Sequence, residues 1–383
     1  MMATLVLMLK AVLLVYLAFF LLLSLGFMQS SPSRERQITG KPNVSVVIAF
    51  RNEREKIPIL LGGLLSQDFP PGKLEIILVD DHSDDDSWQQ VELFSHDFAR
   101  IKKYALPAGR EGKKEAIRMG VSMATGSLII TTDADCLLPM KWISSMVSFY
   151  SKTGAKLIIG PVKYAGPIGK NKAFGTRLFM KLQALEFTSL VSAGAALAKA
   201  GRPILCNGAN LAFEKSIYPC DPGVLVPETP SGDDMFLLLH AKRNATGLIR
   251  FLQDQEAIVE IMPHTRFGTF LAQKARWASK AKYFRDRDVI LTGLLVVFSN
   301  TALLLSFLLP LYAPKLWPVP VILLSLKTIA DYIFLLPWLG FFRQDNLARF
   351  IPLVEILYPI YMLLSLAASM NPRLKWKNRR LSA

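Results

Sequence analysis

The sequence predicts an α/β protein with a mostly parallel sheet, helices on both faces of the sheet, and membrane helices at both ends of the chain. Three observations support this fold class. Short runs rich in β-branched residues alternate with helical patterns between residues 44 and 132. One long apolar segment precedes this region, and three more follow it. Acidic motifs come directly after several of the expected strands, where parallel sheets bind their ligands.

The first apolar segment covers residues 4–28 and carries one charge, Lys10. It is long enough to cross a bilayer. A cleaved signal peptide is the competing interpretation, but the apolar stretch is longer than usual for such a peptide and no clear cleavage site follows it. We therefore predict a transmembrane anchor over residues 1–28, followed by a polar linker over 29–43.

Alternating elements are expected in the region after the linker. Val44–Phe50 has the β-branched composition of a buried strand, and an apolar face repeats at helical spacing in the stretch that follows it. An Asp-rich cap begins the second helix. The expected elements are, in order, a strand at 44–50, a helix at 53–66, a strand at 74–79, a helix at 84–100, a helix at 113–124 and a strand at 128–132.

Three apolar blocks follow the α/β region, at roughly 289–313, 317–342 and 350–370. The second contains Lys327 and Asp331, which are four residues apart and so share a helical face. Ionisable groups at membrane depth usually pair or face a protein interior. The third holds Glu355 between two prolines. Three full spans after a cytosolic domain would put the basic tail outside, against the positive-inside rule, so we expect this block to be re-entrant or interfacial.

The formal net charge is +15, but no nucleic-acid motif accompanies it. Basic residues beside membrane segments are explained by contact with anionic lipid, so we expect membrane lipids and no nucleic acid as partners. Residues 165–200 mix aromatic and aliphatic with basic side chains, which fits a helix on the membrane surface or one packed on the sheet. The expected organisation is a cytosolic domain at 44–287 with interfacial helices at about 165–200 and 264–287, a membrane region of two to three helices at 288–372, and a basic tail at 373–383.

Asp133-Ala134-Asp135 follows the third expected strand. Alternate residues of an extended segment point the same way, so both carboxylates can serve one centre. Carboxylates together with phosphate oxygens hold hard divalent cations. The segment therefore predicts a Mg²⁺ or Mn²⁺ site formed by Asp133 and Asp135 together with a phosphorylated ligand.

Further polar residues stand at the ends of the first two strands and at the start of a helix. The turn after the first strand offers backbone amides and the Glu53 carboxylate to a base or a ribose. Asp81 can accept hydrogen bonds from uracil or from ribose hydroxyls. Lys113, at the start of the expected helix at 113–124, adds positive charge to backbone donors that already favour anions.

Asp233 and Asp234 precede an apolar helical pattern, where they fit either a helix cap or a general base. Later, Gln273-Lys274-Ala275-Arg276-Trp277 combines a group that can pair with diphosphate, Arg276, with a flat aromatic face, Trp277, for a sugar. A basic amphipathic helix is the alternative interpretation of this segment.

These ordered motifs resemble those of the inverting family 2 glycosyltransferases of GT-A fold, over about residues 44–280. The sequence is similar to the membrane-embedded branch of this family, which includes the cellulose, chitin and hyaluronan synthases and the ceramide glucosyltransferases. The resemblance implies a first nucleotide-binding segment at Phe50, Asn52 and Glu53, with Phe50 where proline often stands. It implies a nucleotide-binding Asp81, a donor-side Lys113, a direct metal ligand in Asp135, and a ribose or metal partner in Asp133. It also implies a general base at Asp234 and an acceptor side with Gly208, Asn210, Asp233, Gln273 and Trp277, and it places Arg276 near the diphosphate.

The function so implied is a membrane-bound inverting glycosyltransferase that acts at the cytosolic face of a bacterial inner or plasma membrane. It would use a nucleotide-diphosphate sugar, UDP-sugar being favoured by family frequency, with Mg²⁺ or Mn²⁺ and a lipid, lipid-linked or glycan acceptor. A processive polysaccharide synthase is the alternative within enzymes. A non-catalytic membrane scaffold of GT-A fold is the alternative from another class.

Overall fold

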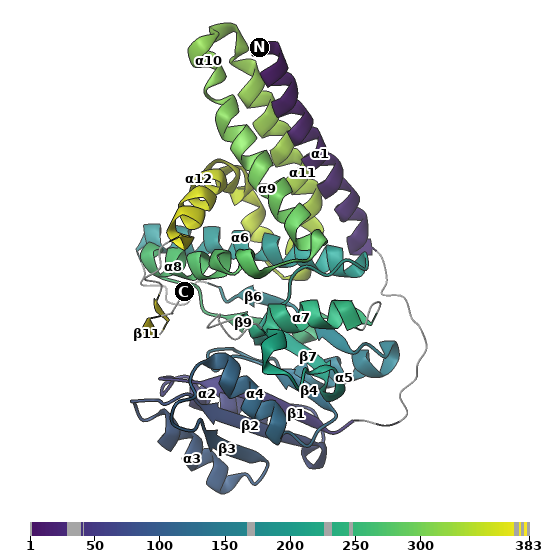
Figure 1. Cartoon of the computed structure of the whole chain (residues 1–383), viewed down its shortest axis with the longest axis vertical. Coiled ribbons are helices and arrows are strands. Elements are labelled where there is room, and N and C mark those ends of the chain that lie inside the picture. The colour runs from purple at the N-terminus through teal and green to yellow at the C-terminus, as the bar shows by residue number, and fades with distance from the viewer. Residues whose placement is uncertain are drawn as a thin grey trace. The chain divides into compact units, whose positions relative to one another are not determined.

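A computed structural model of the chain (Figure 1) describes residues 2–28, 40, 42–166, 173–225, 232–244, 248–370, 375–376 and 379–380. Most of the expected linker at 29–43 and most of the basic tail lie outside these residues. The chain forms two compact units. The helical unit comprises Met1–Gln29, Gly166–Arg202 and Pro263–Leu374, and the sheet unit comprises Ser30–Ala165, Pro203–Met262 and Lys375–Ala383.

The sheet unit contains a seven-stranded sheet with the order β3-β2-β1-β4-β7-β5-β8. β7 is antiparallel to both of its neighbours, and every other neighbouring pair in this sheet is parallel. The strands are β1 (Val44–Phe50), β2 (Leu74–Asp80), β3 (Ile101–Ala105), β4 (Leu128–Thr131), β5 (Leu157–Ile159), β7 (Leu211–Glu214) and β8 (Ile249–Phe251). The prediction of a mostly parallel sheet is confirmed.

Helices and two small strand pairs complete this unit. The helices are α2 (Ile57–Leu65), α3 (Ser87–Asp97), α4 (Lys113–Met123), α5 (Trp142–Thr153) and α7 (Asp233–Asn244). The pairs are β6 (Val162–Tyr164) with β9 (Val259–Ile261), and β10 (Lys375–Trp376) with β11 (Arg379–Arg380). The helix expected at 53–66 begins four residues later, because the intervening residues form a turn in which the Glu53 carbonyl accepts hydrogen bonds from the amides of Lys56 and Ile57.

The core of the sheet unit lies around β1 and β2. Every residue of β2 is buried, as are six of the seven in β1, so both faces of these strands are covered. Parallel strands covered on both faces have nearly continuous apolar sequences, which explains why the β-branched runs were informative. α4 packs closely on β1, since a Cβ at Gly120 would lie 2.4 Å from Cγ1 of Val47.

The helical unit contains helices that are long and apolar enough to cross a membrane, in the four segments Thr4–Phe27, Arg287–Tyr312, Pro314–Phe341 and Asp345–Ser369. The helices of this unit are α1 (Met2–Met28), α6 (Phe174–Lys199), α8 (Phe267–Ser279), α9 (Arg287–Ser306), α10 (Leu309–Tyr312), α11 (Pro318–Phe341) and α12 (Ile351–Ser369).

Aromatic contacts join α1 to α11 within the helical unit. The ring centroids of Phe20 and Phe334 are 5.2 Å apart, and those of Phe27 and Trp338 are 5.0 Å apart. The amphipathic segment expected at 165–200 forms α6, which packs among the apolar helices. Lys199 near its end donates a hydrogen bond to the carbonyl of Phe27 at 2.8 Å.

Candidate functional site

The carboxyl ends of β1, β2 and β4 lie at one edge of the sheet, because these strands are adjacent and parallel. Phe50 at the end of β1 is in register with Asp80 at the end of β2. Asp133 comes two residues after the end of β4. The structure therefore brings three of the sequence motifs to the same edge of the sheet.

Hydrogen bonds join the turns that follow β1 and β2. The carbonyl of Phe50 accepts a hydrogen bond from the amide of Asp81 at 2.9 Å. Arg51 donates to the carbonyl of Asp81 at 2.7 Å, and Oδ1 of Asn52 accepts from the amide of Asp84 at 3.0 Å. Asn52 has a φ of 53°, in the left-handed region that asparagine tolerates well. Phe50 and Asn52 therefore shape this loop, and the Phe50 side chain is buried in the core.

The Asp81 carboxylate connects the second strand with the start of α4. Its Oδ1 accepts a hydrogen bond from the amide of Gly112 at 3.0 Å, and the residue is 1% exposed. Gly112 has a φ of 103°, a conformation that favours glycine, and it directly precedes Lys113. The acidic motif after β2 and the Gly-Lys motif are thus neighbours in space.

Lys113 lies at the centre of a group of predicted site residues. Its ammonium forms an ion pair with Asp133. Burial by itself lowers the pKa of Lys113, but the carboxylates of Asp133, Asp233 and Asp234 outweigh burial, and the pKa is raised. A Cβ at Gly208 would lie 3.4 Å from Nζ of Lys113 and 3.6 Å from Oδ2 of Asp234. These five residues, far apart in sequence, form one charged cluster, which we call the Lys113 cluster.

Backbone amides hold the Asp234 carboxylate in place. Its Oδ2 accepts a hydrogen bond from the amide of Gly208 at 3.0 Å, and its Oδ1 accepts one from the amide of Met235 at 2.8 Å. Asp233 and Asp234 stand in the first turn of α7, where negative charge stabilises exposed N–H groups. The capping role expected from the sequence is therefore present, and a catalytic role for Asp234 is compatible with it.

A second lysine, which the sequence analysis did not single out, contacts Asp135, the other carboxylate of the Asp133-Ala134-Asp135 segment, which we call the D-x-D segment. Nζ of Lys56 is 3.7 Å from Asp135 and 2.9 Å from Glu53. Burial by itself lowers the pKa of Lys56, but the carboxylates of Asp135 and Glu53 outweigh burial, and the pKa is raised. Asp133 therefore faces Lys113, and Asp135 faces Lys56. The signal in the sequence was the spacing of Glu53 and Lys56, three residues apart before a helix.

Tyr218 is another residue near the cluster that no motif indicated. Its hydroxyl is buried and has no hydrogen-bond partner in the part of the chain that the structure describes. Burial raises the pKa of Tyr218, and the nearby Asp233 carboxylate raises it further. Its ring stacks on Phe213 with centroids 5.7 Å apart. A single tyrosine outside any regular pattern carries no signal by which sequence reasoning could have found it.

Asn210, expected on the acceptor side, has a structural role here. It is fully buried, and Nδ2 donates hydrogen bonds to the carbonyls of Pro161 and Ala257 at 2.8 and 2.9 Å. Its Oδ1 accepts a hydrogen bond from Trp142 at 2.8 Å. Both Oδ1 and Nδ2 of the Asn210 side chain are therefore bonded to protein partners. The buried side chain offers no surface to an acceptor, so Asn210 is not part of the proposed site.

Gln273, Arg276 and Trp277 lie together on α8, in the helical unit. Burial lowers the pKa of Arg276. Among the described residues its guanidinium forms no ion pair, which leaves it available for an anion. Nζ of the intervening Lys274 lies 4.6 Å from the centroid of the Trp277 ring.

Lys274 also fixes α8 to neighbouring helices of the helical unit. Its buried ammonium pairs with Glu186 of α6. The other oxygen of Glu186 accepts a hydrogen bond from the hydroxyl of Tyr361, on α12, at 2.7 Å. Lys274, to which the sequence analysis gave no role, thus anchors the helix that carries Gln273, Arg276 and Trp277.

The D-x-D carboxylates are suitable ligands for a hard divalent cation. The side chains of Asp133 and Asp135 are 32% and 41% exposed, so both are accessible. Within the described ranges, no group of three or more His, Cys, Asp or Glu side chains could hold a metal by itself. A cation bound here would need additional oxygen ligands, such as phosphate oxygens.

Comparison with known proteins agrees with these features. Residues 45–196 match the family model described as glycosyl transferase family 2. Glycosyltransferase AglE of Haloferax volcanii is 30% identical over 148 residues, which cover 39% of this chain and 48% of that protein. The undecaprenyl-phosphate 4-deoxy-4-formamido-L-arabinose transferase of Pectobacterium atrosepticum is 37% identical over 111 residues, 29% of this chain and 34% of that protein. The chain thus spans less than half the length of either relative.

One solved structure resembles most of the chain. It is the mannosyltransferase PcManGT from Pyrobaculum calidifontis in complex with GDP-Man and Mn²⁺, which matches with a TM-score of 0.58 and 17% identity over 94% of this chain and 99% of that one. At this identity the likeness concerns the fold, which is of the GT-A type. Residues 45–196 therefore match a glycosyl transferase family 2 domain, and the chain has a GT-A fold.

Proposed function

We propose that this protein is a membrane-bound inverting glycosyltransferase that moves a sugar from a nucleotide-diphosphate donor to a lipid or lipid-linked acceptor. The observation that carries the proposal is the Lys113 cluster, which joins Lys113, Asp133, Asp233, Asp234 and Gly208 at the carboxyl edge of a parallel sheet. The apolar helices and a relative named as an undecaprenyl-phosphate sugar transferase support a lipid acceptor. UDP-sugar is the favoured donor, by family frequency.

The donor would bind along the edge formed by the turns after β1, β2 and β4. Asp81 and Glu53 would contact the nucleoside, in the loop that Phe50 and Asn52 shape. Asp133 and Asp135 would hold Mg²⁺ or Mn²⁺ together with the donor diphosphate. When bound, such a cation neutralises the negative charge that develops on the departing diphosphate. Lys113 and Lys56, which pair with these carboxylates, would then be free to contact phosphate oxygens.

Transfer requires the removal of one proton from the acceptor hydroxyl. The hydroxyl oxygen attacks the anomeric carbon from the side opposite the diphosphate, and its proton passes to the Asp234 carboxylate. The bond from the anomeric carbon to the phosphate oxygen breaks, and its electron pair leaves with the nucleoside diphosphate. Attack from the opposite side inverts the anomeric configuration. The amides of Gly208 and Met235 keep the base oriented, as general-base catalysis requires.

The acceptor would approach next to Gly208, where the missing side chain leaves room for a sugar or a lipid head group. Asp233 would contact its hydroxyl groups. Gln273, Arg276 and Trp277, on α8, keep the roles that the family resemblance implies: acceptor binding for Gln273 and Trp277, and pairing with the diphosphate for Arg276. With this assignment the sheet unit faces the cytosol, where nucleotide sugars are available.

The test is donor turnover by the purified full chain in lipid nanodiscs, with Mn²⁺, a panel of nucleotide sugars and a membrane lipid extract as the acceptor. We expect one donor to be consumed with formation of a glycolipid. Asp234→Asn should reduce the rate by about 10²- to 10⁴-fold, the usual contribution of a general base. Asp68→Asn, at an exposed carboxylate in the loop after α2, is the matched control and should leave the rate unchanged.

Three outcomes would overturn the proposal or one of its assignments. A folded wild-type protein that consumes no donor would favour a non-catalytic scaffold of GT-A fold. An Asp234→Asn variant as active as Asp68→Asn would place the general base elsewhere. Formation of a polymer rather than a single glycolipid would identify a processive synthase.

A further inference from the structure

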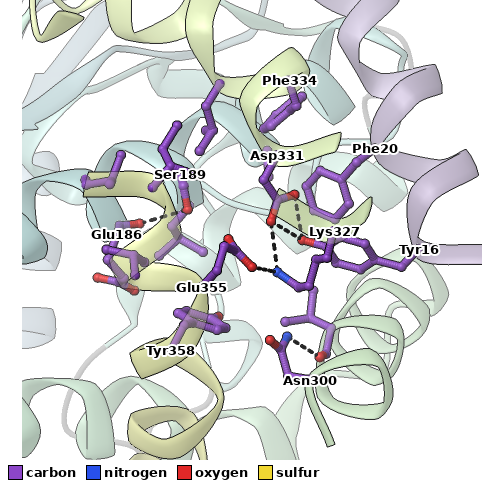
Figure 2. A pocket seen from close by; sticks show the side chains of 17 residues that line it. Tyr16, Phe20, Glu186, Ser189, Asn300, Lys327, Asp331, Phe334, Glu355 and Tyr358 are labelled. Carbon is purple, nitrogen blue, oxygen red and sulfur yellow. Dashed lines mark hydrogen bonds and ion pairs between the residues drawn. The ribbon is translucent and has the colours of Figure 1, made fainter. Parts of the chain in front are cut away.

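The helical unit encloses a cavity of about 100 Å³ that has no part in the proposed transfer (Figure 2). Side chains from α1, α6, α9, α11 and α12 line it. Its charged and amide-bearing lining residues are Glu186, Asn300, Lys327, Asp331 and Glu355. Polar groups inside a bundle of membrane-type helices are expensive to bury, so their presence requires an explanation.

Part of the explanation is an ion network that joins three helices. Nζ of Lys327 donates to Oδ2 of Asp331 at 2.8 Å and pairs with Glu355 of α12. The hydroxyl of Tyr16, on α1, donates to Oδ1 of Asp331 at 2.9 Å. Each of these four residues is at most 6% exposed. The network gives each of its charged groups a partner, as the helical spacing of Lys327 and Asp331 suggested, and it joins α1, α11 and α12.

Packing alone leaves one polar group of the cavity unexplained. Asn300 is 1% exposed, and its Nδ2 donates to the carbonyl of Val296 at 2.7 Å. Its Oδ1 is buried without a hydrogen-bond partner among the described residues. Tyr358, on α12, also lines the cavity and brings a hydroxyl group to it. An unsatisfied buried acceptor is costly, so a donor in the cavity would stabilise this arrangement.

The charges around the cavity select the kind of ligand. Three carboxylates, Glu186, Asp331 and Glu355, line it together with one ammonium, that of Lys327. Lys274, outside the lining, neutralises Glu186. A phosphate group would meet more negative than positive charge here. A neutral hydroxyl group can donate to Asn300 or to a carboxylate without that repulsion.

The size and the remaining walls of the cavity fit an amphiphile. Its volume is well above the roughly 10–15 Å³ that a single water requires. Much of the rest of the lining is apolar and comes from helices whose outer faces carry exposed hydrophobic side chains. These apolar lining residues include Phe20, Leu185, Leu190, Val296, Phe334 and Val354.

We propose that this cavity binds the hydroxyl-bearing head group of a neutral membrane lipid of the diacylglycerol type. A hydroxyl of the head group donates to Oδ1 of Asn300, and an oxygen of the head group accepts a hydrogen bond from Tyr358. The apolar walls contact the adjoining carbon atoms of the lipid. Binding at this site does not depend on the proposed sugar transfer, so the Asp234→Asn variant should bind the lipid as the wild type does.

The test uses the full chain in phosphatidylcholine nanodiscs that contain a photoactivatable diacylglycerol, with labelled peptides mapped by mass spectrometry. We expect labelling of peptides from α6, α9 and α12 that unlabelled diacylglycerol suppresses. Phosphatidic acid with the same acyl chains, which replaces the hydroxyl by a phosphate, should not suppress it. Asn300→Leu should weaken binding by up to about tenfold, the effect of one lost hydrogen bond.

Two further variants separate a loss of binding from a loss of folding. Ser299→Ala alters the neighbouring buried residue of α9, which bonds to its own helix and does not line the cavity, and it should bind like the wild type. Ala193→Leu adds volume at the cavity wall without removing a polar group and should reduce labelling.

Several results would overturn the proposal. Equal suppression by phosphatidic acid would show that the site does not select a neutral head group. If unlabelled diacylglycerol suppressed no labelling of the cavity peptides, the cavity would not bind this lipid, and water or an ion would be its occupant. Labelling unchanged by both Asn300→Leu and Ala193→Leu would place the lipid elsewhere on the helices.

Discussion

The amino and carboxyl edges of the parallel part of the sheet carry carboxylates in different surroundings. Near the amino end of β2, Glu75 accepts hydrogen bonds from Ser45, Lys102, Gly126 and both the amide and the hydroxyl of Thr125. Its side chain is 11% exposed, and its partners all belong to the protein. At the carboxyl edge, Asp133 and Asp135 each face one lysine, and their side chains are 32% and 41% exposed.

The difference between these two edges separates stability from function. A carboxylate held by several protein donors stabilises the fold and has little capacity left for a ligand. A partly exposed carboxylate that pairs with a lysine contributes less to stability, because solvent partly screens the pair. Such a pair can exchange its lysine for a cation or a phosphate. Substitutions at the two edges should therefore have opposite effects on activity and on stability.

The largest effect is expected from Asp133→Asn at the carboxyl edge. Removal of this charge should reduce sugar transfer by about a hundredfold or more, because it weakens charge stabilisation at the diphosphate. The free energy of unfolding should change by less than about 1 kcal/mol, since the ion pair is partly exposed. Initial rates with saturating Mn²⁺ and thermal unfolding in detergent measure the two quantities.

Asp86→Asn is the control for that experiment, because Asp86 forms an exposed ion pair with Arg54 away from the D-x-D segment. It should change neither quantity. Full activity of Asp133→Asn would show that the Asp133 carboxylate has no part in sugar transfer. The two edges of the sheet would then not differ in function.

Glu75→Gln should have the next largest effect, on stability alone. The substitution removes a charged acceptor from a network of donors and should reduce the free energy of unfolding by about 2 kcal/mol. Sugar transfer per folded molecule should stay within about twofold of the wild type, because Glu75 lies at the other end of β2 from the site. Chemical denaturation measures the free energy of unfolding, and transfer rates divided by the concentration of folded protein measure the activity. A large loss of transfer with unchanged stability would contradict the separation of roles.

The contribution of the Glu75 network to the stability of the wild-type protein should depend on pH. Burial raises the pKa of Glu75, but hydrogen bonds from Lys102, Ser45 and Thr125 outweigh burial and lower the pKa from 4.5 to about 2. A carboxylate with a lowered pKa contributes stability above its unfolded pKa and loses that contribution as the pH falls through the folded pKa. The stability difference between wild type and Glu75→Gln should therefore be constant near neutral pH and shrink from about pH 4.5 towards pH 2. A difference that grows with acid would refute this assignment.

The smallest effect is expected from Lys56→Met. The Lys56 ammonium competes with a cation for Asp135, so its removal should strengthen apparent Mn²⁺ binding by about two- to fivefold, in line with an exposed charge pair. Titration of the donor-free protein with Mn²⁺ measures this affinity. Lys152→Met, on the exposed end of α5, is the control. Weaker Mn²⁺ binding would show instead that Lys56 positions Asp135 for the metal.

The first half of the sheet was predictable because its signals are local. β1, β2 and β4 are apolar runs that end at acidic motifs, and parallel neighbours bring such ends to one edge. β5, β7 and β8 were missed, since strands of three or four residues leave too short a pattern to recognise. β3 was also missed. It is an edge strand with the sequence IKKYA and mostly half-buried residues, so it lacks the apolar run that marks a buried strand.

By itself, the sequence determined the class of the sheet, the apolar helices at both ends, and the residues of the Lys113 cluster. The first two depend on composition and spacing within a short segment, and the residues of the cluster came from local motifs together with the family resemblance. The tertiary structure alone decided that Lys56 faces Asp135, that Asn210 is a buried bridge, and that Asn300 borders a cavity. These features depend on contacts between segments far apart in the chain, such as the 315 residues between Tyr16 and Asp331. Burial and charge pairing arise from such contacts, and no local pattern encodes them.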